Sequence, residues 1–229
     1  MPLAPTATLG DLVTEDSRRS RILERFGLDY CCNGADTLAD ATAAAGLDVE
    51  VVIAALDLPA AAPAAEHGPT TNADLAHDIV DTHHAYMWEE MLRLAALVEK
   101  VCRVHGERHP ELARVHDAFV EAVAALEPHM TTEERSVFPT IAKLEKGQAA
   151  TLSASLPESI DRLVAALGVV GDLFHEIRAL TNGYTWPADG CNSYKMMLEG
   201  LQEMELDLHE HIHKENNVLF PQALRLVQA

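Results

Sequence analysis

The chain has 229 residues, of which 36 are acidic and 17 are basic, and its formal net charge is −19 at pH 7. So acidic a protein repels phosphate groups, which argues against nucleic acid or an anionic membrane surface as a partner. Hydrophobic residues make up 48% of the chain, enough for a packed core, and no run of about 18 apolar residues predicts a membrane-spanning helix.

The N-terminal residues 1–6 contain neither a basic segment nor an apolar one, so no signal peptide is expected. The chain has four cysteines, two of them adjacent, which is too few for the disulfide framework of a small secreted protein. We therefore expect a cytoplasmic protein with reduced thiols.

Residues 1–58 predict a small helical domain. Apolar residues form short helical faces around Leu12 and around Leu23, and residues 37–45 and 48–56 continue the pattern. Residues 59–71 contain three prolines, a glycine and little to bury, so we interpret them as a linker.

Residues 72–229 predict a second domain built from long helices. Apolar residues recur every three or four positions over four segments, which are 72–105, 110–146, 157–180 and 188–226. Prolines inside the second and fourth segments predict bends. No segment shows the alternation of a strand, and the connections are short. The pattern therefore favours an all-α fold with an up-down four-helix bundle.

The second and fourth of these helices carry the same motif. Two segments, which begin at His129 and His211, both read H-x-x-x-E-x-x-x-[V/L]-F-P, with the glutamates at Glu133 and Glu215. One such pair alone is common as an ion pair on a solvated surface. Two copies in a bundle present two imidazoles and two carboxylates to a shared interior, as in di-iron proteins. Because the motif lacks a thiolate, it favours iron or manganese over structural zinc.

The first long helix is expected to add a ligand. His84 lies on the apolar stripe of Val80, Met87 and Met91, whereas His83 is rotated by roughly 100° about the helix axis. A histidine on such a stripe is more often a core residue, but the two motifs nearby favour metal binding. We therefore predict His84, rather than His83, as a ligand.

Cys31 and Cys32 stand next to each other before the turn signal Asn33-Gly34. Adjacent thiols can bind a soft metal or cycle through a disulfide. Alternatively, one of them fills a small core, as free cysteines often do. The residues alone leave both interpretations open.

Several segments are specific enough to indicate a family. Phe26–Gly34 is similar to the signature of a small N-terminal domain, and residues 105–111, 178–187 and 211–221 recur together with Cys191. Over nearly its whole length the chain resembles the iron–sulfur cluster repair proteins, also called repair of iron centres proteins. The resemblance implies a hemerythrin-like bundle with a non-haem di-iron centre. It also implies a role in restoring iron–sulfur clusters after nitrosative or oxidative damage.

The resemblance further implies which residues act. The family's metal ligands carry over to His84, His129, Glu133, His211 and Glu215. The family's paired cysteines carry over to Cys31 and Cys32, as a redox or iron-transfer site.

One ligand of the family does not carry over. Counting back without gaps from Ile177 and Gly171 places the histidine of the third long helix at Leu167, which cannot bind metal. His175 is eight residues further along, about 12 Å on a helix, and is a poor substitute. The resemblance therefore implies two irons per chain, one of which is a ligand short and keeps a position open for water, peroxide or nitric oxide.

The leading interpretation is a protein that donates iron or electrons to damaged iron–sulfur proteins. A second interpretation is a hemerythrin-like module that binds or senses O₂ or nitric oxide. A third is a di-iron enzyme that reduces nitric oxide or peroxide, so the question of enzymatic activity stays open. The sequence is compatible with a monomer and with a homodimer.

Overall fold

A computed structural model describes residues 3–59, 70–148 and 155–228 of the chain. Every regular element within these ranges is helical, which confirms the predicted all-α class. None of the helices in these ranges has the length and apolar content of a membrane-spanning segment. Residues 60–69, which make up most of the predicted linker, lie outside the described ranges.

The N-terminal helix group consists of α1 (Leu9–Glu15), α2 (Ser20–Arg25), α3 (Leu38–Ala44) and α4 (Val49–Leu56). Three of these helices begin at a capping side chain that accepts a hydrogen bond from a backbone N–H of the first turn; the caps are Thr8, Thr37 and Asp48. The apolar faces expected around Leu12 and Leu23 are buried, so the short helices share a core.

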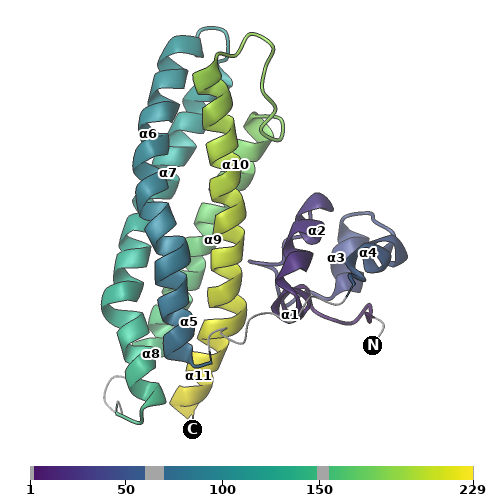
Figure 1. Cartoon of the computed structure of the whole chain (residues 1–229), viewed down its shortest axis with the longest axis vertical. Coiled ribbons are helices and arrows are strands. Elements are labelled where there is room, and N and C mark those ends of the chain that lie inside the picture. Colours follow the sequence, from purple (N-terminus) through teal and green to yellow (C-terminus); the bar gives the residue numbers. More distant parts are fainter. Residues whose placement is uncertain (1–2, 60–69, 149–154, 229) are drawn as a thin grey trace.

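The four-helix bundle contains the remaining helices. They are α5 (Asn72–Ile79), α6 (Ala85–His105), α7 (Glu111–Thr132), α8 (Phe138–Glu145), α9 (Leu156–Leu180), α10 (Asn192–His213) and α11 (Phe220–Gln228). They form four antiparallel arms, namely α5–α6, α7–α8, α9 and α10–α11, as predicted (Figure 1). The N-terminal helix group lies on the flank of the bundle beside α10 (Figure 1).

The last arm begins at Asn192, later than the predicted start at residue 188. Residues 187–190 form a turn in which the Gly190 N–H donates to the Pro187 carbonyl over 2.9 Å. Trp186 packs so closely on this turn that a Cβ on Gly190 would lie 2.5 Å from Trp186 Nε1. The turn therefore delays the start of the helix.

A π-helical turn interrupts three of the four arms. The turns span Val80–His84, Glu133–Val137 and Lys214–Leu219. Pro139 and Pro221 follow the second and third turns, and because proline has no N–H, the regular helical hydrogen bond cannot form there. A π-helical turn holds one extra residue and is frequent at functional sites. Each of the three turns contains one of the predicted ligands.

A polar layer divides the buried apolar residues of the bundle into two clusters. The lower cluster, at the α8 and α11 end, reaches up to Ile79, Val137, Leu163 and Leu219. The upper cluster, which is continuous with the core of the N-terminal helix group, begins at Met87, Met130, Leu167 and Ile212. Three arms contribute histidine or glutamate side chains to this layer. At the same level α9 has two leucines one turn apart, Leu163 and Leu167.

Candidate metal centre

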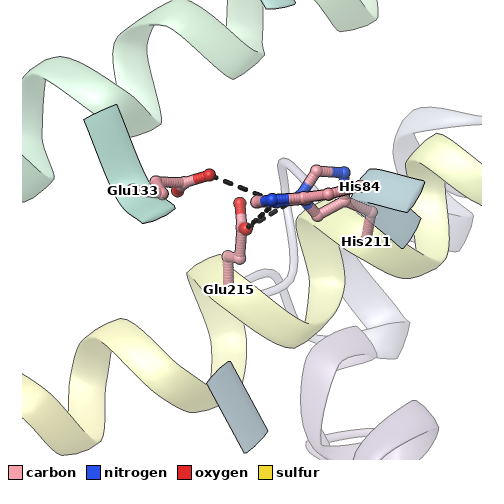
Figure 2. A group of neighbouring side chains, drawn as sticks. All are labelled: His84, Glu133, His211 and Glu215. Carbon is pink, nitrogen blue, oxygen red and sulfur yellow. Dashed lines mark hydrogen bonds and ion pairs between the residues drawn. The ribbon is translucent and has the colours of Figure 1, made fainter. Parts of the chain in front are cut away.

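The five predicted ligands meet in the polar layer, and Figure 2 shows four of them converging from three segments of the chain. His211 Nε2 lies 2.8 Å from Glu215 Oε1, and His129 Nε2 lies 3.0 Å from Glu133 Oε2. His84 Nε2 lies 3.4 Å from Glu133 Oε2 and 3.2 Å from His211 Nε2. All three Nε2 atoms therefore point at the two carboxylates.

This cluster is buried and lacks a permanent positive charge. The side chains of Glu133 and Glu215 are fully buried, and among the described residues no lysine or arginine pairs with either carboxylate. Among the described residues, both oxygens of Glu133 and Oε2 of Glu215 make no hydrogen bond of regular geometry, although His129 Nε2 lies 3.0 Å from Glu133 Oε2. Burying a carboxylate without a partner costs several kcal/mol, about the scale of a domain's whole stability. A cation between the carboxylates would supply the missing partners.

The pKa values show the same charge imbalance. Burial alone would lower the pKa of His84, but the contacts and charges of Glu133 and Glu215 outweigh it and raise the pKa to about 9. The same carboxylates overcome the burial of His129 and raise its pKa to about 10. Burial opposes ionisation of Glu215, yet the surrounding histidines hold its pKa well below its usual range. The cluster thus attracts positive charge.

A further carboxylate, which sequence reasoning missed, orients one of the histidines. His84 Nδ1 lies 3.0 Å from Glu134 Oε1, and Trp88 Nε1 donates to the same oxygen over 3.4 Å. Metal-binding histidines usually give their second ring nitrogen to such an acceptor, which fixes the tautomer. The available signal was the position of Glu134 directly after a predicted ligand.

His83 is buried beside the cluster, although helical periodicity placed it on another face. The π-helical turn Val80–His84 adds a residue at this point, so that both neighbouring histidines are turned inward. The ring of His83 stacks on the ring of His211 with centroids 5.6 Å apart, and its Nδ1 lies 2.9 Å from Asp207 Oδ1. Its Nε2 is buried and finds no hydrogen-bond partner among the residues described. Helical periodicity therefore did not predict the burial of His83, whereas His84 is the histidine that lies in the cluster.

The two adjacent cysteines lie on a loop that contacts the bundle. Cys31 is buried and Cys32 is exposed, and their sulfur atoms are 3.8 Å apart. Asp29 Oδ1 accepts hydrogen bonds from the Cys31 thiol over 3.1 Å and from the Cys32 backbone N–H over 2.9 Å. Contact with Cys32, burial and the Asp29 charge raise the pKa of Cys31 well above its usual range. The buried thiol therefore stays protonated, and Cys32 is the accessible one.

Comparison with known proteins gives two family matches. Residues 75–223 match the model described as Hemerythrin HHE cation binding domain, and residues 5–59 match one described as Domain of Unknown function (DUF542). The chain is 35% identical over 218 residues to "Iron-sulfur cluster repair protein YtfE" of Salmonella paratyphi B, which covers 94% of this chain and 96% of the relative. The chain belongs to the hemerythrin-like iron–sulfur cluster repair family.

A second relative in this family is "Iron-sulfur cluster repair protein ScdA" of Staphylococcus haemolyticus. It is 29% identical over 214 residues, which covers 93% of this chain and 95% of the relative. The YtfE protein of Salmonella newport matches at 35% identity over 218 residues. The resemblance inferred from the sequence motifs is thus confirmed, and with it the hemerythrin-like bundle.

The residues present fit the cation that this family's bundle domain binds. Imidazole nitrogens and carboxylate oxygens without a thiolate form the donor set of non-haem iron and manganese sites. The unpartnered carboxylate oxygens of Glu133 and Glu215 are the atoms that such a cation would contact. The chemistry of the donors and their unmet hydrogen-bonding capacity thus agree.

The third arm contributes no polar donor to this cluster among the described residues. Leu167 is completely buried in the upper apolar cluster, directly next to the polar layer. His175, which the sequence offered as a poor substitute, lies outside this cluster. It groups with Glu205 and His209, and its ring centroid is 6.1 Å from that of His209. The structure therefore brings together five of the expected side chains and leaves the α9 side of the layer apolar.

Proposed function

We propose that this chain takes part in repairing damaged iron–sulfur clusters and that the polar layer binds non-haem iron for this purpose. The proposal is supported by three histidines around two buried carboxylates with unpartnered oxygens, in a chain whose relatives are named iron–sulfur cluster repair proteins. These names favour repair over a module that binds or senses O₂ or nitric oxide. They equally favour it over an enzyme that reduces nitric oxide or peroxide.

In this proposal the histidines and the glutamates bind the metal in different ways. His84, His129 and His211 would hold the metal through Nε2, and Glu133 and Glu215 would hold it through their carboxylate oxygens, two on each residue. Iron in such a site supplies one-electron exchange and, when released, the metal needed to rebuild a cluster. Glu134 accepts the second ring N–H of His84 and so keeps Nε2 free for binding.

The apolar α9 side shapes the proposed centre. Two irons would share five protein ligands, since Leu167 offers none, so one position stays open. The apolar wall at Leu167 would favour neutral small molecules such as nitric oxide or O₂ over charged ones. A groove of about 380 Å³ between α7 and α9 is lined by His129, Leu163 and six other residues. We propose this groove as the route by which small molecules reach the open position.

We propose a division into an N-terminal domain at residues 1–58, a linker at 59–71 and the bundle at 72–229. The N-terminal domain would exchange iron or electrons with the client protein through Cys32, the exposed thiol, with Cys31 as its partner. The clients would be damaged iron–sulfur proteins. All four cysteines are free, which agrees with the cytoplasm as the proposed compartment.

The proposal is tested by measuring repair directly. The chain is loaded with ferrous iron without oxygen and mixed with an iron–sulfur dehydratase whose cluster has been damaged by nitric oxide. His211→Ala removes a proposed ligand, and His77→Ala, in which the side chain replaced is 76% exposed, serves as the matched control. We expect the wild-type chain and the control to restore dehydratase activity and His211→Ala to fail. Equal recovery with His211→Ala, or with ferrous salt alone, would contradict the proposal.

A further inference from the structure

A second group of metal-binding side chains lies on the opposite face of α10. His209 precedes the ligand His211 by two residues, which turns its side chain by roughly 200° about the helix axis toward the N-terminal helix group. There it meets Glu205, one turn earlier on α10, and His175 on α9. One donor atom from each of these three residues lies within 4.8 Å of the others.

Glu205 shows that this group has an unmet capacity to bind. Its side chain is 1% exposed, and Oε2 accepts hydrogen bonds from Arg178 Nε over 2.9 Å and from the Tyr184 hydroxyl over 2.8 Å. The other oxygen, Oε1, is buried and has no hydrogen-bond partner within the part of the chain that the structure describes. A carboxylate with one oxygen held by outer residues and the other free is arranged as a one-oxygen metal ligand.

The surroundings are suited to a small cation. Next to the three residues is a cavity of about 80 Å³, which is lined by His175, His209 and Arg178 from the bundle and by six residues of the N-terminal helix group. Two of those six are carboxylates, Glu24 and Asp29. Glu24 Oε1 lies 3.4 Å from His209 Nδ1. Glu24 also pairs with Arg21 over 3.6 Å, so two guanidinium groups stand against the three carboxylates, which still leaves an excess of negative charge for a cation to neutralise.

We propose that His175, Glu205 and His209 form a second site, which binds one divalent transition-metal ion where the N-terminal helix group meets the bundle. Two imidazoles and one carboxylate form the donor set of open zinc sites, and three protein ligands leave further coordination positions open. Ferrous iron binds such a site more weakly than cobalt does, so loading the polar layer with ferrous iron leaves it available. The site is separate from the polar layer and does not depend on the proposed repair function. Because Glu24 and Asp29 of the N-terminal helix group line the cavity next to these ligands, binding of the ion strengthens the contact between the two parts of the chain.

The test is a cobalt titration of the full-length, tag-free chain after the polar layer has been filled with ferrous iron without oxygen. Cobalt is the probe because its visible absorption reports nitrogen and oxygen ligands. We expect one further Co²⁺ per chain. His175→Ala should weaken its binding by more than about tenfold, which is the scale of losing an important contact at a metal site. Because the His175 side chain is exposed, this variant should fold normally.

A matched variant separates this site from binding to surface histidines. His116→Ala, which removes a histidine that pairs only with its neighbour Asp117 among the described residues, should bind cobalt as the wild-type chain does. His209→Ala should lose the ion as His175→Ala does. The iron content of each variant, measured separately, should stay at the wild-type level. No further Co²⁺ in the wild-type chain, or equal cobalt binding by His175→Ala and His116→Ala, would overturn the proposal.

Discussion

Asn217 donates its side-chain N–H to the carbonyl oxygen of Cys31 over 3.0 Å. The same amide lies 3.3 Å from the Tyr30 carbonyl oxygen. Asn217 stands two residues after Glu215, in the same π-helical turn Lys214–Leu219. One turn of helix therefore presents a proposed metal ligand to the inside of the bundle and holds the cysteine loop on the outside.

Replacing Asn217 tests this connection. Asn217→Ala leaves two carbonyl oxygens without their donor, which costs about 1–3 kcal/mol when such groups are buried. We expect the loop to open more often, so that the buried Cys31 thiol reacts faster with an alkylating reagent, as followed by mass spectrometry. Asn192→Ala, an exposed asparagine at the start of α10, is the control. Identical alkylation rates in the two variants would show that Asn217 does not hold the loop.

Replacing Gly34 with alanine tests the same contact, because the substitution adds a Cβ atom next to Asn217. A Cβ on Gly34 would lie 2.1 Å from Asn217 Oδ1, whereas a Cβ on Gly168 in α9 meets no other atom within 4 Å. We expect Gly34→Ala to lower the free energy of unfolding in urea. Gly168→Ala should raise it by about 0.5–1 kcal/mol, because alanine is the better helix former. A Gly34→Ala chain as stable as Gly168→Ala would mean that the loop packs elsewhere.

The arms of the bundle and the five clustered side chains could be predicted because their signal is local and repeated. The motif starting at His129 recurs at His211 with the same spacing, and i, i+4 neighbours share a face of any helix. His84 followed from an apolar stripe of the same kind. Such patterns can be recognised in the sequence without knowledge of tertiary contacts.

Other features could not be predicted, because they depend on contacts between distant segments. A π-helical turn shifts the register by one residue, which is why His83 is buried although a regular helix would turn it away. His175 groups with His209 only because α9 and α10 lie side by side. The pairing of Asn217 with Cys31 joins residues 186 positions apart. No spacing rule within one segment reports such contacts.

Bound iron should stabilise the fold, and the gain should depend on Glu215. A ligand that binds only the folded state adds about 2.7 kcal/mol at 100 times its Kd, or about 5–10 °C in Tm for a chain of this size. Glu215→Gln keeps the shape but removes the carboxylate charge that the surrounding histidines stabilise, so we expect its metal-free Tm to fall and the iron-induced increase to shrink. Calorimetry with and without a chelator measures both values. An undiminished increase would exclude Glu215 as a ligand.

We expect Leu167 to cause a difference in iron affinity between the two proposed metal positions. With leucine on the α9 side, a ferrous iron titration should show two steps, the second weaker. Leu167→His supplies an imidazole at the boundary of the polar layer and should bring the steps together. Ile160→His, two turns away in the lower apolar cluster, is the control and should leave two steps. One step in the wild-type chain, unchanged by Leu167→His, would contradict the five-ligand account.

The most direct test of the central claim is the iron content of the chain after anaerobic loading with ferrous iron and removal of unbound metal. We expect bound iron, up to two per wild-type chain, and almost none in the double variant His129→Ala, His211→Ala. The His77→Ala control should retain the wild-type amount. Full retention of iron by the double variant, with its helical content preserved, would contradict the assignment of the polar layer as the metal centre.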